Sequence, residues 1–223
     1  MSSELTTATL VGDFVAGNPG TARVLEAHGL DYCCGGQRPL AEAAAESGLD
    51  ADAILAELTA VAPTTDELDV TTLTNTELCD HLVQVHHEYL WREMPRLTEL
   101  ANKVARVHGA NHPELREVQK TWQALVTDLT EHLMTEEQEQ FPAIKAAEAD
   151  GSTFTTEGVD QLLREHDVAG ELLAKLRELT GGYTTPADGC GSYRALYAGL
   201  EEAERDLHTH IHKENNILFP RLR

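Results

Sequence analysis

One pattern of four residues occurs twice in this chain, and it constrains the fold more than any other feature. In both copies Glu follows His by four residues, Phe by nine and Pro by ten. The copies are His132, Glu136, Phe141 and Pro142 in EHLMTEEQEQFP, and His210, Glu214, Phe219 and Pro220 in THIHKENNILFP. Residues four apart on an α-helix are rotated by about 40° and raised by about 6 Å, so each His–Glu pair directs its donor atoms into one small volume. Such a pair is suited to binding a metal ion.

Each His–Glu pair continues the apolar face of its helix. Apolar residues before each pair recur every three or four positions, and the next steps land on the His and the Glu. These apolar residues are Leu115, Val118, Trp122, Leu125 and Leu129 before the first pair, and Leu196, Leu200, Ala203 and Leu207 before the second. A buried polar group without a partner costs about 1 to 3 kcal/mol, and an unpaired carboxylate costs more. Four such residues in one core therefore require a compensating cation.

Each copy is preceded by a helix that carries a single His on its apolar face. His87 lies 45 residues before His132, and His166 lies 44 residues before His210. The repeating unit is thus a helical hairpin, and two hairpins predict a four-helix bundle. The predicted metal ligands are His87, His132, Glu136, His166, His210 and Glu214.

The other polar residues receive less specific interpretations. His86 points about 100° away from His87, and His87 fits the apolar register better. His108 is expected to be a hydrogen-bonded core residue, and Glu139 is left open as a residue supporting a ligand. Residues expected at the surface or at helix ends are His81, His112, His208, His212, Glu137 and Glu139, and those expected to pack in the interior are Cys79 and Cys190.

Composition and charge restrict the class of protein. The 223 residues are 41% hydrophobic but only 5% aromatic, which favours an all-α fold. The net charge of −21 argues against nucleic acid or an anionic membrane as a partner. The start of the chain lacks the pattern of a signal peptide, and four cysteines, two of them adjacent, do not form a secreted disulfide framework. We therefore expect a cytoplasmic protein.

The chain divides into three segments. Residues 1–63 predict a small helical domain, 64–73 a polar linker, and 74–223 the bundle. Thr74 and Glu77 form a capping box, and Pro95 is expected to kink or divide the helix that follows. The small domain is expected to hold helices over 10–16, from Asn18 to Gly29, over 39–47 and over 50–62; the bundle helices are expected over 74–108, 113–150, 156–180 and 192–219.

The small domain contains the turn DYCCGG, which places Cys33 and Cys34 side by side. The two glycines free the backbone there, so the turn can present both thiols to a reaction partner. Free cysteines also behave as small buried hydrophobes. The residues alone leave both interpretations open.

Together, the DYCCGG turn and the His and Glu motifs resemble the RIC family, the di-iron proteins for repair of iron centres. The resemblance covers nearly the whole chain and implies a hemerythrin-like bundle with two non-haem iron ions, bridged by an oxo or hydroxo oxygen. It implies that His87 and His132 hold one iron, that His166 and His210 hold the other, and that Glu136 and Glu214 bridge them. It further implies protection or repair of iron–sulfur proteins damaged by nitric oxide or peroxide, with Cys33 and Cys34 in redox or iron transfer.

Several hypotheses remain open at this stage. The same centre could catalyse nitric oxide reduction or an oxidation, so whether the protein is an enzyme is undecided. It could instead bind or sense dioxygen, although oxygen-carrying hemerythrins have more His ligands. A structural zinc is disfavoured, because zinc sites usually use four ligands at one ion. Imidazole and carboxylate suit manganese as well as iron, and the sequence does not decide whether the chain forms a homodimer.

Overall fold

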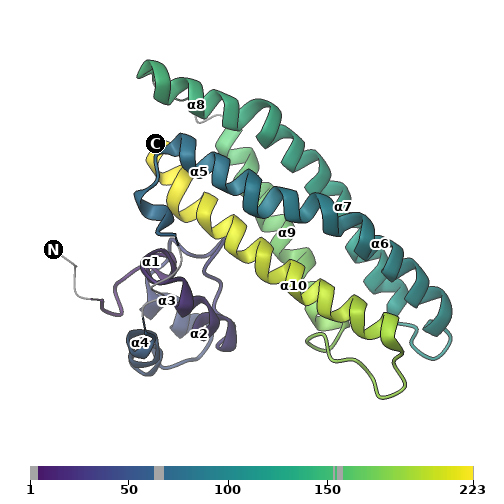
Figure 1. The fold of residues 1–223 in the computed structure, drawn as a ribbon. Coiled ribbons are helices and arrows are strands. Elements are labelled where there is room, and N and C mark those ends of the chain that lie inside the picture. The colour runs from purple at the N-terminus through teal and green to yellow at the C-terminus, as the bar shows by residue number, and fades with distance from the viewer. Residues whose placement is uncertain (1–4, 63–67, 153, 155–157, 223) are drawn as a thin grey trace. The chain divides into compact units, whose positions relative to one another are not determined.

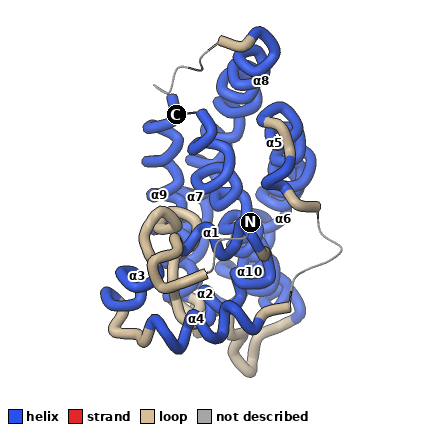
Figure 2. The backbone as a smooth tube through the Cα atoms, turned by 90° about the vertical axis from the view of Figure 1, so that its left-hand side faces the viewer, coloured by secondary structure: helices blue, strands red, loops and turns tan. Residues whose placement is uncertain are grey.

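The protein is built from α-helices joined by turns. The computed structural model describes residues 5–62, 68–152, 154 and 158–222, and within these ranges it contains no β-strand (Figure 2). An isolated bridge pairs Leu10 with Pro39. The predicted all-α class is therefore confirmed. Over the same ranges, no helix combines the length and the apolar character needed to cross a membrane.

The chain folds into two compact units. One comprises Met1–Leu78 together with Thr209–Arg223, and the other comprises Cys79–His208. The C-terminal residues thus belong to the same unit as the N-terminal helices, although they are the most distant in sequence. The predicted domain boundary at residue 63 and the linker residues 64–67 lie outside the described part of the chain.

The N-terminal unit begins with four short helices whose ends follow the local sequence. The Asn18 side chain accepts a hydrogen bond from the Gly20 amide, and that of Asp50 accepts from the amides that open α4. Gly29 and Gly48 each end a helix with φ of +68°, a conformation that favours glycine. The helices are α1 (Val11–Gly17), α2 (Ala22–Ala27) after a 3₁₀ turn (Pro19–Thr21), α3 (Leu40–Glu46) and α4 (Ala51–Ala60).

The second unit holds most of a four-helix bundle (Figure 1), whose first helix begins and whose last helix ends in the first unit. In chain order the elements are α5 (Asn75–Leu82), a π-helical segment (Val83–His87), α6 (Glu88–His108), α7 (Leu115–Thr135), a π-helical segment (Glu136–Gln140), α8 (Phe141–Asp150), α9 (Val159–Leu179) and α10 (Gly191–Lys213). A third π-helical segment (Glu214–Leu218) and a 3₁₀ turn (Phe219–Leu222) follow α10 in the first unit.

Two predictions about the first bundle helix have different outcomes. The capping box is confirmed, because Glu77 accepts from the Thr74 amide at 2.9 Å and Thr74 Oγ1 accepts from the Glu77 amide at 3.1 Å. The expectation that Pro95 could divide the helix is wrong, because α6 continues through it; the α-helical hydrogen bonding is interrupted earlier, at Val83–His87. The start of the third bundle helix, predicted at Thr156, lies outside the described residues, and α9 is described from Val159.

Specific contacts fix the bundle helices to one another. The Trp122 indole of α7 donates to Thr98 Oγ1 of α6 at 3.1 Å. Arg177 of α9 makes two hydrogen bonds, at 3.1 and 2.7 Å, to the buried Glu204 of α10. Gly199 brings α10 close to α6, since a Cβ there would lie 2.5 Å from a methyl carbon of Leu97. These contacts align the helices that carry the predicted ligands.

Candidate metal centre

Four of the six predicted ligands lie inside the bundle unit, on three different helices. His87 ends the first π-helical segment, His132 is in the last turn of α7, Glu136 opens the second π-helical segment, and His166 is in α9. All four side chains are at most 5% exposed. The structure therefore places these polar groups in the core, as the apolar register predicted.

Carboxylates on neighbouring positions orient two of the histidines. The Nδ1–H of His87 donates to Glu137 Oε1 at 3.0 Å, and that of His132 donates to Glu165 Oε2 at 2.8 Å. A carboxylate can only accept, so both rings carry their proton on Nδ1 when neutral, and Nε2 is left as the electron-pair donor. The hydrogen bond from His132 also lowers the pKa of Glu165, which keeps this carboxylate ionised.

The Nε2 atoms of His87 and His132, which carry no proton, both lie close to Glu136. His87 Nε2 lies 3.5 Å and His132 Nε2 lies 3.3 Å from Glu136 Oε2. His132 Nε2 is also 3.1 Å from His166 Nε2. The ligand atoms of His132, Glu136 and His166 all lie within 4.8 Å of one another, so this cluster could hold a metal ion.

Glu136 provides a direct test of whether the residues fit a cation. Its side chain is 0% exposed, and neither carboxylate oxygen has a hydrogen-bond partner among the described residues. A carboxylate buried in this way is strongly unfavourable unless a cation or a proton neutralises it. Imidazole and carboxylate donors suit iron, manganese and zinc. The residues therefore fit a bound metal ion.

The second copy of the repeat has the same local arrangement in the other unit. His210 is 1% and Glu214 is 0% exposed, and His210 Nε2 lies 3.0 Å from Glu214 Oε1. Glu214 opens a π-helical segment, as Glu136 does. The internal repeat seen in the sequence is thus also a repeat of helix geometry.

The Phe–Pro pair after each Glu explains the two π-helical segments. Proline has no amide hydrogen and its ring collides with the carbonyl four residues earlier, so an undisturbed α-helix cannot run into Pro142 or Pro220. A turn widened by one residue absorbs the conflict while the chain stays helical. In both copies the widened turn begins at the glutamate, at Glu136 and at Glu214. The prolines thus locate the change in helix geometry next to the predicted ligands.

His86 and His87 point to different partners. The Nδ1–H of His86 donates to Asp206 Oδ1 of α10 at 2.8 Å, and the edge of its ring faces His81. His87 alone of the two lies beside Glu136. The choice of His87 rather than His86 as a metal ligand stays a prediction.

The DYCCGG turn is organised by Asp31. Asp31 Oδ1 accepts from the amides of Cys33 and Cys34 at 2.9 and 3.0 Å, and Asp31 Oδ2 accepts from the Gly35 amide at 2.9 Å. The Cys33 thiol donates to Asp31 Oδ1 at 3.1 Å, and the two Sγ atoms are 3.9 Å apart. Cys33 is buried and Cys34 half-buried. Hydrogen bonding to Cys34, burial and the nearby Asp31 charge raise the pKa of Cys33, so its thiol stays protonated.

Within the same unit the turn is attached to the residues that follow Glu214. Asn216 Nδ2 donates to the carbonyls of Tyr32 and Cys33 at 3.1 and 2.9 Å, and Asn215 Nδ2 donates to the Cys33 carbonyl at 3.3 Å. Gly36 has to be glycine here, because a Cβ would lie 2.4 Å from the Tyr32 carbonyl oxygen. The Cys33 carbonyl therefore accepts hydrogen bonds from the two residues that follow Glu214, a predicted metal ligand.

Three surface or packing assignments made from the sequence are wrong. His212 is 2% exposed, with Nδ1 3.2 Å from the Tyr32 carbonyl. Glu137 is not merely solvated, because it accepts from His87 and from the Trp91 indole at 2.8 Å. Cys190 is exposed. His212 and Glu137 take their contacts from segments far away in the sequence, which a helical period does not reveal.

Comparisons with known proteins find two family matches, and the longer one also covers residues 209–222, which belong to the first compact unit. Residues 79–222 match the Hemerythrin HHE cation binding domain, and residues 7–62 match a Domain of Unknown function (DUF542). The iron-sulfur cluster repair protein YtfE of Enterobacter sp. (strain 638) is 37% identical over 214 residues, covering 95% of this chain and 94% of that protein. The iron-sulfur cluster repair protein ScdA of Staphylococcus haemolyticus (strain JCSC1435) is 31% identical over 218 residues, covering 96% and 98%. The chain therefore belongs to the family of hemerythrin-type proteins that includes the iron-sulfur cluster repair proteins YtfE and ScdA.

Proposed function

We propose that the protein holds two non-haem iron ions and uses them to repair or protect iron–sulfur clusters damaged by nitric oxide or oxidative stress. The observation that carries the proposal is the buried Glu136 carboxylate, which has no hydrogen-bond partner among the described residues and lies beside the Nε2 atoms of His87 and His132. The repair role is supported by the relatives at 31% and 37% identity, which are named iron-sulfur cluster repair proteins.

The proposed ligands are the six residues of the repeated motif. The match to the hemerythrin domain spans 79–222 and includes all of them. The 3.1 Å distance between His132 Nε2 and His166 Nε2 supports one ion shared by these two residues. His87 and His210 would then hold the second ion, with Glu136 and Glu214 bridging. This pairing differs from the one that the family resemblance implied, in which His87 and His132 shared an iron.

The residues around the proposed centre have separable roles. Glu137 and Glu165 hold the protons on Nδ1 of His87 and His132, which fixes both Nε2 electron pairs toward the ion. Burial of the donor set keeps bulk water away from it. Two imidazoles and two bridging carboxylates would leave each iron short of the octahedral preference of about six ligands. When bound, such a ferrous pair supplies positions for nitric oxide or dioxygen, together with electrons.

Cys33 and Cys34 have a place in the same proposal. The bonds from Asn215 and Asn216 to the Cys33 carbonyl tie the thiol turn to the helix that carries Glu214. We propose that these thiols pass electrons or iron during repair. Partners would be damaged iron–sulfur proteins, with nitric oxide or dioxygen as small ligands, in the cytoplasm.

The first test is the metal content of protein purified without oxygen. We expect about two irons per chain, and one in the variant His132→Ala/His166→Ala if this pair shares an ion. One zinc per chain, or a folded protein that takes up no iron, would rule out the proposal. The variant Glu139→Ala is the matched control, because it removes an exposed carboxylate three residues after Glu136.

The second test is rebuilding of a nitric oxide-damaged iron–sulfur enzyme by the iron-loaded protein. Recovery of enzyme activity in proportion to iron lost from this protein would support iron supply. Continued consumption of nitric oxide with an added electron donor, without iron loss, would instead indicate a nitric oxide reductase. Replacing Cys33 and Cys34 by Ser should preserve the iron content and abolish rebuilding, and unchanged rebuilding would remove the thiols from the mechanism.

A further inference from the structure

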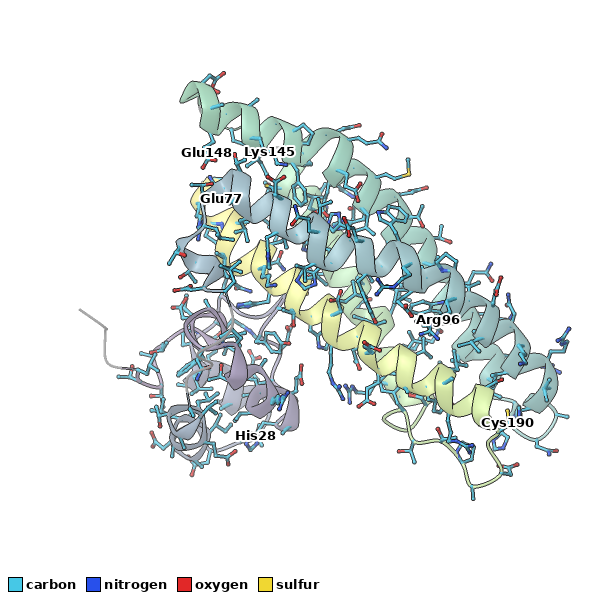
Figure 3. All side chains as sticks on the ribbon, viewed as in Figure 1. His28, Glu77, Arg96, Lys145, Glu148 and Cys190 are labelled. Atoms are coloured by element: carbon cyan, nitrogen blue, oxygen red, sulfur yellow. The ribbon has the colours of Figure 1, made fainter. Side chains whose placement is uncertain are left out.

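A second group of reactive side chains lies where α10 begins (Figure 3). Cys190 directly precedes α10, and its side chain is exposed. His108 is the last residue of α6, and its Nε2 lies 3.2 Å from Cys190 Sγ. An exposed sulfur is thus paired with an imidazole that can take up its proton.

The His108 imidazole packs against an aromatic side chain. Its ring packs against Tyr193, with ring centroids 5.3 Å apart. His112 also packs against Tyr193, in a T-shaped arrangement of the two rings. Its Nε2 lies 3.1 Å from Asp188 Oδ1. His112 also bonds to Glu114, so both nearby carboxylates are engaged by His112 rather than by His108.

Two basic side chains make hydrogen bonds to residues beside Cys190. Arg194 donates to the carbonyl of Gly189 at 2.7 Å, and Lys103 of α6 donates to Ser192 Oγ at 3.0 Å. The His108 imidazole beside the sulfur favours a thiolate over a thiol. Hydrogen bonding from the Tyr193 amide, followed by that from His108, lowers the pKa of Cys190 to about 7. The thiolate is therefore accessible near neutral pH.

The pair is separate from the proposed iron centre. His108 follows His87 by 21 residues in a helical segment, which corresponds to a rise of about 30 Å. Cys190 and His108 also do not belong to any of the groups of three or more ligands found in the described part of the chain. Their chemistry is that of a nucleophile with a base.

We propose that Cys190 forms reversible mixed disulfides with oxidised low-molecular-weight thiols. The Cys190 thiolate attacks one sulfur of the small disulfide, whose S–S bond breaks as the new Cys190–S–S bond forms. The departing half leaves as a thiolate and takes a proton from the His108 imidazolium. Cys190 is thereby oxidised and the departing half reduced, and excess reduced thiol reverses the exchange.

The test uses full-length, iron-loaded protein and oxidised glutathione as the probe. The modified cysteines are identified by mass spectrometry of proteolytic peptides, and the rate at each cysteine is followed between pH 6 and 9. We expect the rate at Cys190 to rise with a midpoint near pH 7. His108→Gln should slow the reaction about tenfold at pH 7 and much less at pH 9, where the thiolate forms without assistance.

Controls separate reactivity from damage to the fold. Cys190→Ser should remove the modified peptide, and His28→Gln should leave the rate unchanged because His28 pairs with Glu57 in the other unit. Helix content by circular dichroism shows whether His108→Gln folds. A rate at Cys190 that is the same in His108→Gln, or a midpoint at the ordinary thiol value of about 8.5, would overturn the proposal.

Discussion

His132 donates its Nδ1–H to Glu165 at 2.8 Å, and its Nε2 lies 3.1 Å from His166, the very next residue of α9. One helix therefore supplies both the carboxylate that orients His132 and the histidine proposed to share its ion. The same arrangement recurs at His87, which bonds to Glu137 through Nδ1 and approaches Glu136 through Nε2. In each case a residue adjacent to a proposed ligand orients a histidine on another helix.

Removing an orienting carboxylate should weaken metal binding without removing a ligand. Glu165→Ala leaves His132 Nδ1 without its acceptor, so the ring can rotate or change tautomer. We expect the affinity for ferrous iron to fall about 10- to 100-fold, measured without oxygen by competition with a chelator. Glu139→Ala is the control. An unchanged affinity in Glu165→Ala would show that this carboxylate does not position the ligand.

The buried Glu136 carboxylate should reduce the stability of the metal-free protein. Glu136→Met fills a similar volume and removes a charged group that has no hydrogen-bond partner among the described residues. We expect the free energy of unfolding of the metal-free protein to rise by about 1 to 3 kcal/mol in urea titrations. The stabilisation by added metal should be lost in the same variant. A less stable metal-free Glu136→Met would contradict the assignment of this residue to a cation.

The burial of the proposed ligands could be predicted from the sequence because their signal is local and repeated. A His and a Glu four residues apart on an apolar helix face are unfavourable to bury without a cation. This pattern occurs twice, each time followed by the same Phe–Pro pair. The helix caps at Asn18, Asp50 and Thr74 could be predicted for the same reason, since each depends on residues two or three positions away.

Other features could not be predicted because they depend on distant partners. The residues that orient the ligands come from other helices, as with Glu165 and His132. His212 and Asn216 bind the backbone of Tyr32, 180 and 184 residues earlier in the chain. Two of the three π-helical segments had a local signal in Pro142 and Pro220, but Val83–His87 has no proline directly after it. A proline was absorbed by a wider turn in each copy instead of ending the helical path there.

Asn216 should hold the thiol turn in place. Asn216→Ala leaves the carbonyls of Tyr32 and Cys33 without two hydrogen bonds and Gln37 without an acceptor. We expect a loss of about 1 to 3 kcal/mol in the stability of this unit, measured by hydrogen exchange, and faster labelling of the buried Cys33 by a thiol reagent. Asn102→Ala is the matched control, because it removes an exposed hydrogen bond to Gln119 in the other unit. Equal labelling of Cys33 in both variants would show that Asn216 does not secure the turn.

His212 should make the metal-free protein less stable as the pH falls. Burial lowers its pKa from 6.5 to about 4 in the folded chain. Between these values the unfolded chain binds a proton that the folded chain does not, so stability is lost as the pH decreases from 6.5 to 4. The loss is at most about 3 kcal/mol, since one pKa unit corresponds to about 1.4 kcal/mol. His212→Gln keeps a polar side chain but does not titrate, so its stability should depend less steeply on pH over this interval. Urea titrations of both metal-free proteins across the interval measure the difference, and equal slopes would show that His212 is protonated in the folded chain as readily as in the unfolded chain.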